Sequence, residues 1–172
     1  MIRKLFIAVT MFLFALLQFS VFPQISLITT TPNLLIALTS AYGLMRDKKS
    51  GLVVGFICGL AIDIFFGYAL GYYAVIYGII GYLNGSLHKL FYPDSIRMPL
   101  MAFAASDFIY GVIVYITYFF MNGDFAFHYY LMHVIIPEMI YTVVLMVLLF
   151  PIILKINDKI EKRENRSAKK FV

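Results

Sequence analysis

Residues 51–85 read GLVVGFICGLAIDIFFGYALGYYAVIYGIIGYLNG, and this stretch predicts the architecture of the chain. Glycine or aspartate recurs in it at every fourth position, at Gly51, Gly55, Gly59, Asp63, Gly67 and Gly71. A step of four residues advances about 400° around an α-helix, so the first four positions share one slowly drifting face. Glycine costs about 1 kcal/mol per residue in an ordinary helix interior, whereas membrane helices associate through close backbone approach. The stretch therefore predicts a membrane helix whose packing seam ends in one buried carboxylate.

Composition places the whole chain in the same class. Of its 172 residues, 62% are hydrophobic and 13% are charged, and its mean hydropathy is +0.89. A typical soluble domain has roughly 45–50% apolar residues, and so short a chain cannot hide this much apolar surface in a soluble core. We predict an all-α, polytopic membrane protein without a separate soluble domain. Its one cysteine, Cys58, excludes a disulfide framework and is expected to be a small buried hydrophobe.

Six apolar segments approach the length of about 20 residues that a membrane span needs. We place them at about residues 5–22, 32–45, 51–66, 68–87, 99–121 and 131–154, in one transmembrane bundle over residues 1–154. The first is longer than the apolar region of a usual signal peptide, so we expect a retained span closed by Pro23. Pro32 and Pro99 suit the first turn of a helix. The sixth span begins between Tyr129 and Pro137.

The basic side chains predict the orientation. All 14 lysines and arginines lie in the N-terminal segment, in the two connections around residues 46–49 and 89–97, or in the tail, and the loops 23–31, 67–71 and 122–128 contain none. With six spans every basic residue lies on one side, which the positive-inside rule makes the cytoplasm. We therefore expect both termini to be cytoplasmic, and residues 155–172 to form a short basic tail. The net charge of +5 is not interpreted as nucleic-acid binding.

Asp63 is the first of three carboxylates that lie within predicted spans. It follows Gly51 by twelve residues, roughly 18 Å along a helix, which places it in the outer half of the membrane. The chain turns just beyond it at Gly67, where backbone N–H groups are free. We expect the carboxylate to accept those hydrogen bonds and to fix the turn between the third and fourth spans. A contact with a partner, or a proton-linked role, is the alternative.

Asp107 and Glu138 are the other two. Asp107 lies roughly 12 Å from the cytoplasmic side, and we expect it to form hydrogen bonds inside the bundle. Glu138 lies in the first turn of the sixth helix if Pro137 opens that helix, near the positive end of its dipole. If Pro137 is interior, it removes one backbone hydrogen bond and bends the helix. We expect the first arrangement, in which residues 128–136 are an interfacial segment and His133 lies at headgroup level.

These polar residues do not form a recognisable catalytic or metal-binding pattern. The chain contains no H-E-x-x-H spacing, no G-x-S-x-G turn, no P-loop and no dinucleotide fingerprint. The candidates for a pocket, Asn33, Asp63, Asp107, His133 and Glu138, are predicted to lie at different depths. The sequence therefore predicts no catalytic residue, no metal site and no cofactor.

Three features together resemble the MreD family of rod shape-determining proteins. Pro32-Asn33-Leu34-Leu35 opens a short second span, the pattern G-x-x-x-G-F-x-x-G-L-x-x-D-x-x-x-G-x-x-x-G follows over residues 51–71, and an aromatic helix ends in GYLNG. Length, six spans, short loops and a basic C-terminal tail agree with the family. Family members often have aspartate after the proline, where this chain has Asn33.

The resemblance implies a non-enzymatic scaffold of the bacterial elongation complex, or elongasome, in the cell membrane. Its implied partners are the bitopic protein MreC, filaments of the actin-like MreB, and the peptidoglycan synthases of elongation, a transpeptidase and a glycosyltransferase. Contacts with membrane lipids and a homo-oligomer are compatible with this role. The family is also similar in fold to the S-components of energy-coupling vitamin transporters, so a small-molecule-binding or transport subunit is the alternative, and an intramembrane enzyme is a third class.

With loops this short, recognition of a partner has to take place mostly within the bilayer. We therefore expect the seam of Gly51, Gly55 and Gly59 either to pack the third span inside the bundle or to receive the helix of MreC.

Overall fold

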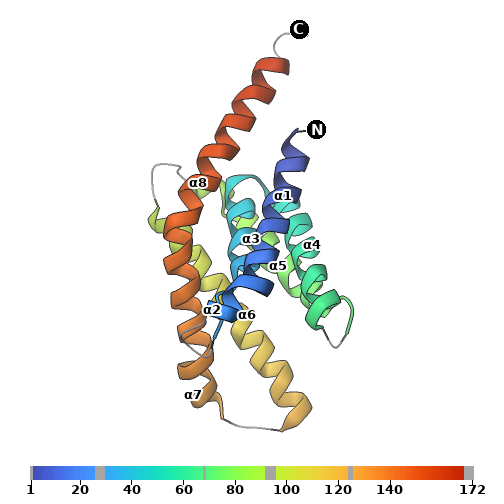
Figure 1. The fold of residues 1–172 in the computed structure, drawn as a ribbon, viewed down its shortest axis with the longest axis vertical. Coiled ribbons are helices and arrows are strands. Elements are labelled where there is room, and N and C mark those ends of the chain that lie inside the picture. The colour runs from blue at the N-terminus through green and yellow to red at the C-terminus, as the bar shows by residue number, and fades with distance from the viewer. Residues whose placement is uncertain (1, 26–29, 68, 92–95, 124–125, 169–172) are drawn as a thin grey trace.

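The structure is a computed structural model that describes residues 2–25, 30–67, 69–91, 96–123 and 126–168. Within these ranges the chain forms six helices, which confirms the all-α class (Figure 1). In chain order they are α1 (Ile2–Leu16) continued by η1 (Leu17–Val21) and α2 (Phe22–Ile25); α3 (Leu34–Met45); α4 (Lys48–Phe66); α5 (Tyr72–Ser86), followed by the short turn η2 (His88–Leu90); α6 (Arg97–Asn122); and α7 (Phe127–Tyr130) continued by η3 (Leu131–Ile135) and α8 (Ile136–Ala168). Tyr68, the predicted start of the fourth span, and residues 169–172 of the tail lie outside the described residues.

Four helices are long and apolar enough to cross a membrane: Arg3–Gln24, Lys48–Phe66, Arg97–Phe119 and Phe127–Lys162. The other two, α3 with 12 residues and α5 with 15, are shorter. At 1.5 Å per residue they reach about 18 and 22 Å, less than the ~30 Å of a hydrocarbon core. The number of crossings therefore depends on these two inner helices, and six crossings stays a prediction.

Two prolines that we expected at helix boundaries lie inside continuous helices instead. Pro23 does not close the first helix, and Pro137 does not open the last one. Each follows a five-residue π-helical turn by two positions: the N–H of Phe22 bonds to the carbonyl of Leu17, and the N–H of Ile136 bonds to that of Leu131. Proline has no N–H to donate to the preceding turn. A wide turn beside it rearranges the neighbouring backbone hydrogen bonds, so that the helix continues through the proline. Residues 128–136 are therefore part of the last helix and not a separate segment before it, and their position at the membrane interface stays a prediction.

The start of the second predicted span is also corrected. Asn33 precedes α3, and its side-chain Oδ1 accepts a hydrogen bond of 3.3 Å from the N–H of Ile36. A residue that caps a helix in this way lies outside it, so Pro32 comes before the helix and not in its first turn. The start of the fourth predicted span is corrected as well. The connection between α4 and α5 ends at Gly71, whose φ of 101° is left-handed. Only glycine adopts this conformation readily. Since it is not a helical conformation, Gly71 lies outside α5, which begins at Tyr72.

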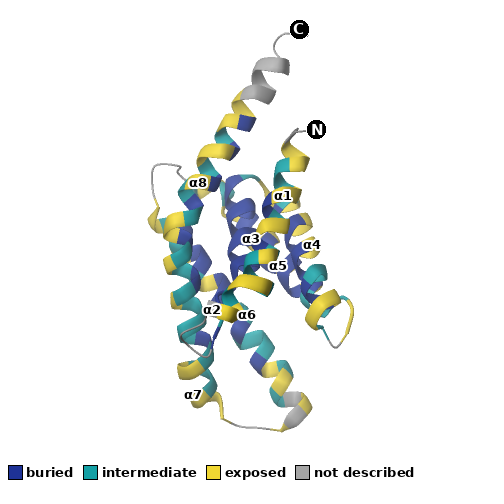
Figure 2. Ribbon diagram, viewed as in Figure 1, coloured by how far each residue is buried: buried dark blue, intermediate teal, exposed yellow. Residues whose placement is uncertain are grey.

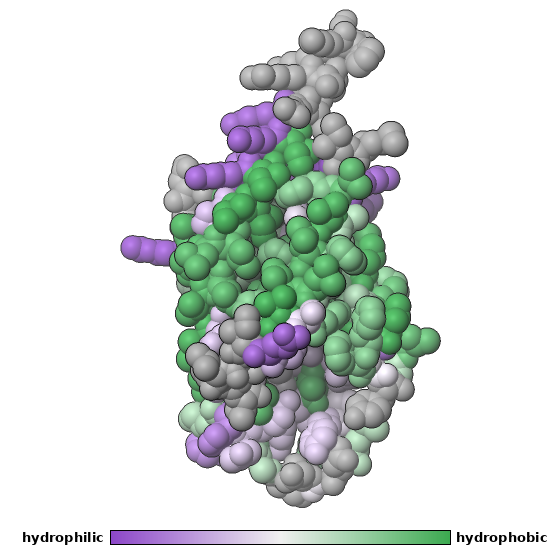
Figure 3. Space-filling model, viewed as in Figure 1, coloured by the Kyte–Doolittle hydropathy of each residue, from purple (hydrophilic) through white to green (hydrophobic). Residues whose placement is uncertain are grey.

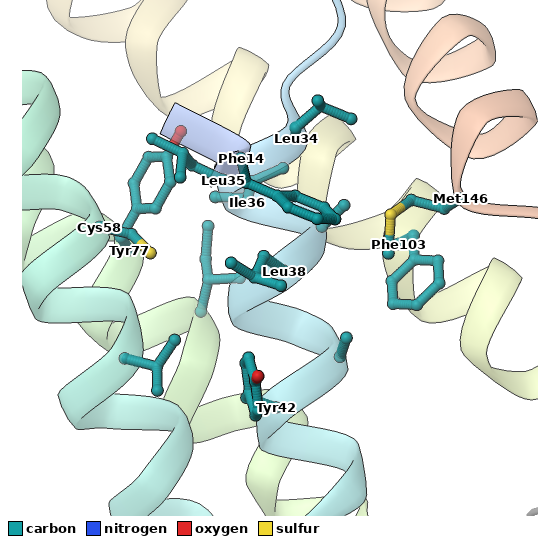
Figure 4. Packing of buried hydrophobic residues seen from close by; sticks show 14 of the residues in the cluster. Phe14, Leu34, Leu35, Ile36, Leu38, Tyr42, Cys58, Tyr77, Phe103 and Met146 are labelled. Atoms are coloured by element: carbon teal, nitrogen blue, oxygen red, sulfur yellow. The ribbon is translucent and has the colours of Figure 1, made fainter. Parts of the chain in front are cut away.

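Helix α3 is the centre of the bundle, since every one of its residues is buried (Figure 2). Cys58 and Tyr77 lie on one side of it and Phe103 and Met146 on the other (Figure 4). Tyr42 of α3 hydrogen-bonds the Thr10 hydroxyl of α1 at 2.8 Å. A short helix that is apolar all round is stable only when other helices cover it, and here the longer helices do so. Cys58 is buried and not in a disulfide.

Both chain ends lie at the same end of the bundle (Figure 1). Hydrophobic residues cover the middle of the face seen in Figure 3, and strongly hydrophilic ones gather toward the end that carries the termini. Helix α8 runs on to Ala168, so the basic tail continues the last helix. Arg46, after α3, donates a hydrogen bond to Asn157 of α8 and links this end of the bundle to that extension.

Asp47 caps α4, and we predict that this cap is sensitive to pH. Its Oδ1 accepts the N–H of Ser50 at 2.9 Å, and the hydrogen bonds from Ser50 lower the pKa of Asp47 below its ordinary value. Because the folded-state pKa is the lower one, the stabilisation is complete above the unfolded-state pKa near 3.9 and is lost as the pH falls through the folded-state pKa. We expect Asp47→Ala to cost about 1 kcal/mol at pH 7 and almost nothing in strong acid, measured by thermal unfolding in detergent. Asp158→Ala on α8 is the control, and an equal loss at both pH values contradicts the prediction.

Candidate functional site

The glycine seam of α4 lies against α5 of the same chain. A Cβ atom placed on Gly51 would lie 2.1 Å from the carbonyl oxygen of Gly81, and one on Gly55 would lie 2.2 Å from that of Tyr77. On Gly59 it would lie 2.4 Å from the carbonyl oxygen of Tyr73. Real Cβ atoms do not approach backbone this closely, so only glycine fits at these positions. The seam therefore forms a helical hairpin inside this chain and leaves no room there for a second helix.

Asp63 ends the seam and caps α5 from the neighbouring helix. Its Oδ2 accepts the N–H groups of Gly71 and Ala74, both at 3.0 Å, and its Oδ1 accepts that of Tyr73 at 2.9 Å. The first N–H groups of a helix have no hydrogen-bond acceptor within the helix. Here the carboxylate of Asp63, which is 97% shielded from solvent, is their acceptor. The donors belong to the start of α5 and not to Gly67, whose N–H donates to the backbone carbonyl of Asp63.

A second group of polar side chains gathers at the start of α3. The hydroxyl of Tyr77 on α5 donates to Oδ1 of Asn33 at 2.7 Å, and the N–H of Asn33 donates to the hydroxyl of Thr142 on α8 at 2.9 Å. Thr142 in turn donates to the backbone carbonyl of Glu138, one helical turn earlier. Three helices are thus joined by buried hydrogen bonds around one asparagine.

Asp107 and Glu138 lie in this same group, so the prediction that the polar candidates lie at different depths is wrong for these two and Asn33. The two carboxyl groups interact electrostatically, and the side chain of Asn33 lies beside both of them. Thr142 also lies beside Asp107, yet neither oxygen of Asp107 has a hydrogen-bond partner of normal geometry within the described residues. The expected hydrogen bonding of Asp107 inside the bundle is therefore incomplete. We name Asn33, Tyr77, Asp107, Glu138 and Thr142 the polar cluster.

The other predicted residues lie elsewhere. His133 is exposed, its Nδ1 is 3.0 Å from the carbonyl of Tyr129, and its ring stacks on that of Tyr129. Ser106, the neighbour of Asp107 in the chain, was not among the predicted residues and belongs to a separate contact, in which it accepts a 2.8 Å hydrogen bond from Asn84. Among the described residues, no three His, Cys, Asp or Glu side chains are close enough together to hold a metal ion.

Tyr77 and Thr142 were missed in the sequence. Thr142 follows Glu138 by four residues and so shares its helix face, which is a signal that could have found it. Tyr77 has no such signal, because it is one of 13 tyrosines and meets Asn33 only through the fold.

Comparison with protein families identifies the chain. The family model described as rod shape-determining protein MreD matches residues 1–160. The chain belongs to the MreD family. It is therefore a non-enzymatic protein of rod-shape determination in the bacterial inner membrane, consistent with its four long apolar helices. Comparisons with curated proteins and with solved structures give no match.

For this MreD-family protein we predict that Asp107→Asn does not destabilise the fold. No basic side chain is among the groups that act on Asp107 or Glu138 in the described part of the chain. Two neighbouring buried carboxyl groups without a cation are costly, so a neutral amide is expected to leave the midpoint of thermal unfolding unchanged or to raise the free energy of unfolding by about 1 kcal/mol. Thr142→Val is the matched comparison, because it removes the acceptor of the Asn33 N–H and should cost 1–2 kcal/mol, within the rough range for a lost buried partner. A larger loss in Asp107→Asn than in Thr142→Val contradicts the prediction.

Proposed function

We propose that this chain is a membrane scaffold of the rod complex that binds MreC and helps to couple MreB filaments to peptidoglycan synthesis. The observation that carries the proposal is the family match over residues 1–160. The fold is compatible with it, because the described residues form a bundle of helices with short connections. Such a protein acts by holding other membrane proteins in place.

The proposal includes six crossings with both termini in the cytoplasm. Two observations support it: the chain ends lie at the same end of the bundle, and Arg3, Lys4, Arg46 and Lys49, from two separate cytoplasmic segments of the predicted topology, line one common groove. Reporter fusions test the orientation. A fluorescent protein that folds only in the cytoplasm should fluoresce when it is fused to either terminus. An alkaline phosphatase, which is active only outside the cytoplasm, should be active when it is fused at residue 123. Opposite locations for the two termini contradict the proposal.

The proposed MreC contact has to use another surface than the glycine seam, because α5 covers that seam. Depletion of the protein from its own cells is expected to turn rods into spheres, and a tagged copy is expected to co-purify with MreC. The Asp47→Ala variant is a useful control, since it changes an exposed cap at the cytoplasmic end and should retain both properties. Rods that persist after depletion, or purification without MreC, contradict the proposed function.

One observation favours a second candidate, a small-molecule-binding subunit. The polar cluster brings together polar groups from the residue that caps α3 and from α5, α6 and α8, inside the bundle, as a ligand site requires. The double variant Asp107→Asn, Glu138→Gln distinguishes the two candidates. Full restoration of cell shape by this variant excludes a ligand-dependent role, whereas loss of shape with unchanged MreC binding favours it.

A further inference from the structure

A groove of about 880 Å³ runs along the outside of the bundle between α1 and α4, with Leu35 of α3 at its floor. Its walls are almost entirely apolar, and the side chains along its edges, such as Phe12, Val53 and Ile57, are about half exposed or more. The groove therefore opens sideways, toward the region that the hydrocarbon of the bilayer occupies. Its volume lies within the ~300–1,000 Å³ that is usual for ligand sites.

The two walls run in the same direction and define two different ends. The lining begins at Arg3 on α1 and at Lys49 on α4 and extends sixteen residues along each to Phe19 and Phe65, roughly 24 Å of helix. At the far end the rings of Phe19 and Phe65 are 5.6 Å apart, and those of Phe19 and Phe66 are 4.9 Å apart. The aromatic contact closes the groove at that end.

The open end is basic. Arg3, Lys4, Arg46 and Lys49 line it, and none of the residues that line the groove is acidic. Arg46 also donates to Asn157 and is held in place by it. A ligand that matches this site has an anionic group at the mouth and one or two long apolar chains along the body.

We propose that this groove binds an anionic glycerophospholipid, with its phosphate at the basic mouth and its acyl chains against α1 and α4. A transmembrane helix of another protein is the less suitable occupant, because it would cover four cationic side chains without supplying a phosphate charge. Each basic residue near a membrane surface contributes about 1 kcal/mol of attraction to anionic lipids, so the mouth favours a lipid with an anionic headgroup. The apolar body of the groove holds its acyl chains. The inference is independent of the proposed contact with MreC.

Native mass spectrometry of the full chain in a mild detergent tests the proposal, with phosphatidylglycerol and phosphatidylcholine of identical acyl chains as probes. We expect at least one phosphatidylglycerol to remain bound and to be preferred over phosphatidylcholine. The double variant Lys4→Gln, Lys49→Gln should reduce the affinity for phosphatidylglycerol on the order of 30-fold, which corresponds to two charges at about 1 kcal/mol each. Lys155→Gln, Lys159→Gln is the matched control: it removes the same charge from exposed positions of α8 outside the groove and should change the affinity less than threefold.

A third variant, Ala61→Phe, fills the body of the groove and leaves every charge in place. It should reduce the binding of both lipids while the variant still elutes as a folded monodisperse protein. Equal binding of the two lipids by the wild type, or equal losses in the two lysine pairs, overturns the proposal. So does an Ala61→Phe variant that keeps phosphatidylglycerol but no longer co-purifies with a membrane partner, because the occupant is then a protein helix.

Discussion

Replacing Gly55 by alanine is expected to destabilise the protein by about 3 kcal/mol or more, the upper end of what overpacking costs in a well-packed interior. The added Cβ would lie 2.2 Å from the carbonyl oxygen of Tyr77 and 2.8 Å from a methyl group of Thr39. The first of these atoms is backbone and cannot turn away, so α4 and α5 would have to separate. The midpoint of thermal unfolding in detergent, together with the yield of monodisperse protein, measures the effect.

Gly78→Ala is the matched control. Gly78 is a buried glycine of α5 that also faces α4, but a Cβ there meets nothing closer than 3.8 Å. The control should be neutral or slightly stabilising, because alanine is the better helix former. If the two substitutions behave alike, the seam is not packed against α5. The same conclusion follows if Gly55→Leu gives a folded protein that has lost only the binding of MreC. That result would support the alternative in which the seam binds the MreC helix.

Asp63→Ala is expected to have a comparable effect, a loss of roughly 3 kcal/mol or more, because each buried donor left without an acceptor costs about 1–3 kcal/mol. Three N–H groups at the start of α5, those of Gly71, Tyr73 and Ala74, lose their acceptor in a buried position. Asp63→Asn should cost less, because one oxygen remains, but its NH₂ group then meets a backbone donor. Hydrogen exchange at these three amides, measured with the thermal midpoint, reports the loss directly.

Asp47→Ala serves as the comparison for Asp63, because both carboxylates cap a helix but Asp47 is exposed. Water replaces the lost partner at the start of α4, whereas it does not reach the start of α5. We therefore expect a several-fold larger loss at Asp63. Equal losses would mean that water enters the connection between α4 and α5.

The hairpin of α4 and α5 is the part of the fold that could be predicted from sequence, because its determinants are local. The four-residue spacing of Gly51, Gly55 and Gly59 predicts a face of close approach, and Asp63 lies within one turn of the connection that it stabilises. The prediction that the donors lie at Gly67 is wrong: they lie at the start of α5, which follows the left-handed Gly71.

The polar cluster could not be predicted, because it depends on helix boundaries that the prolines obscured. With Pro137 inside the last helix, Glu138 lies eleven residues from its start at Phe127, about 16 Å along it. Asp107 lies fifteen residues before the end of α6 at Asn122, roughly 22 Å along that helix. Because the two helices are antiparallel, these offsets bring the two carboxyl groups to within about one helical turn of the same level. A helix start at Pro137 would place Glu138 at the membrane surface and separate it from Asp107.

The cap that Asp63 provides also constrains the order of assembly during synthesis. Helix α5 is short, contains three glycines and an asparagine, and receives its first hydrogen-bond acceptor from the helix made before it. A nascent α5 that left the translocon by itself would expose those amides to lipid. The hairpin is therefore expected to leave the translocon as one unit, with α4 waiting at its exit until α5 has been translated.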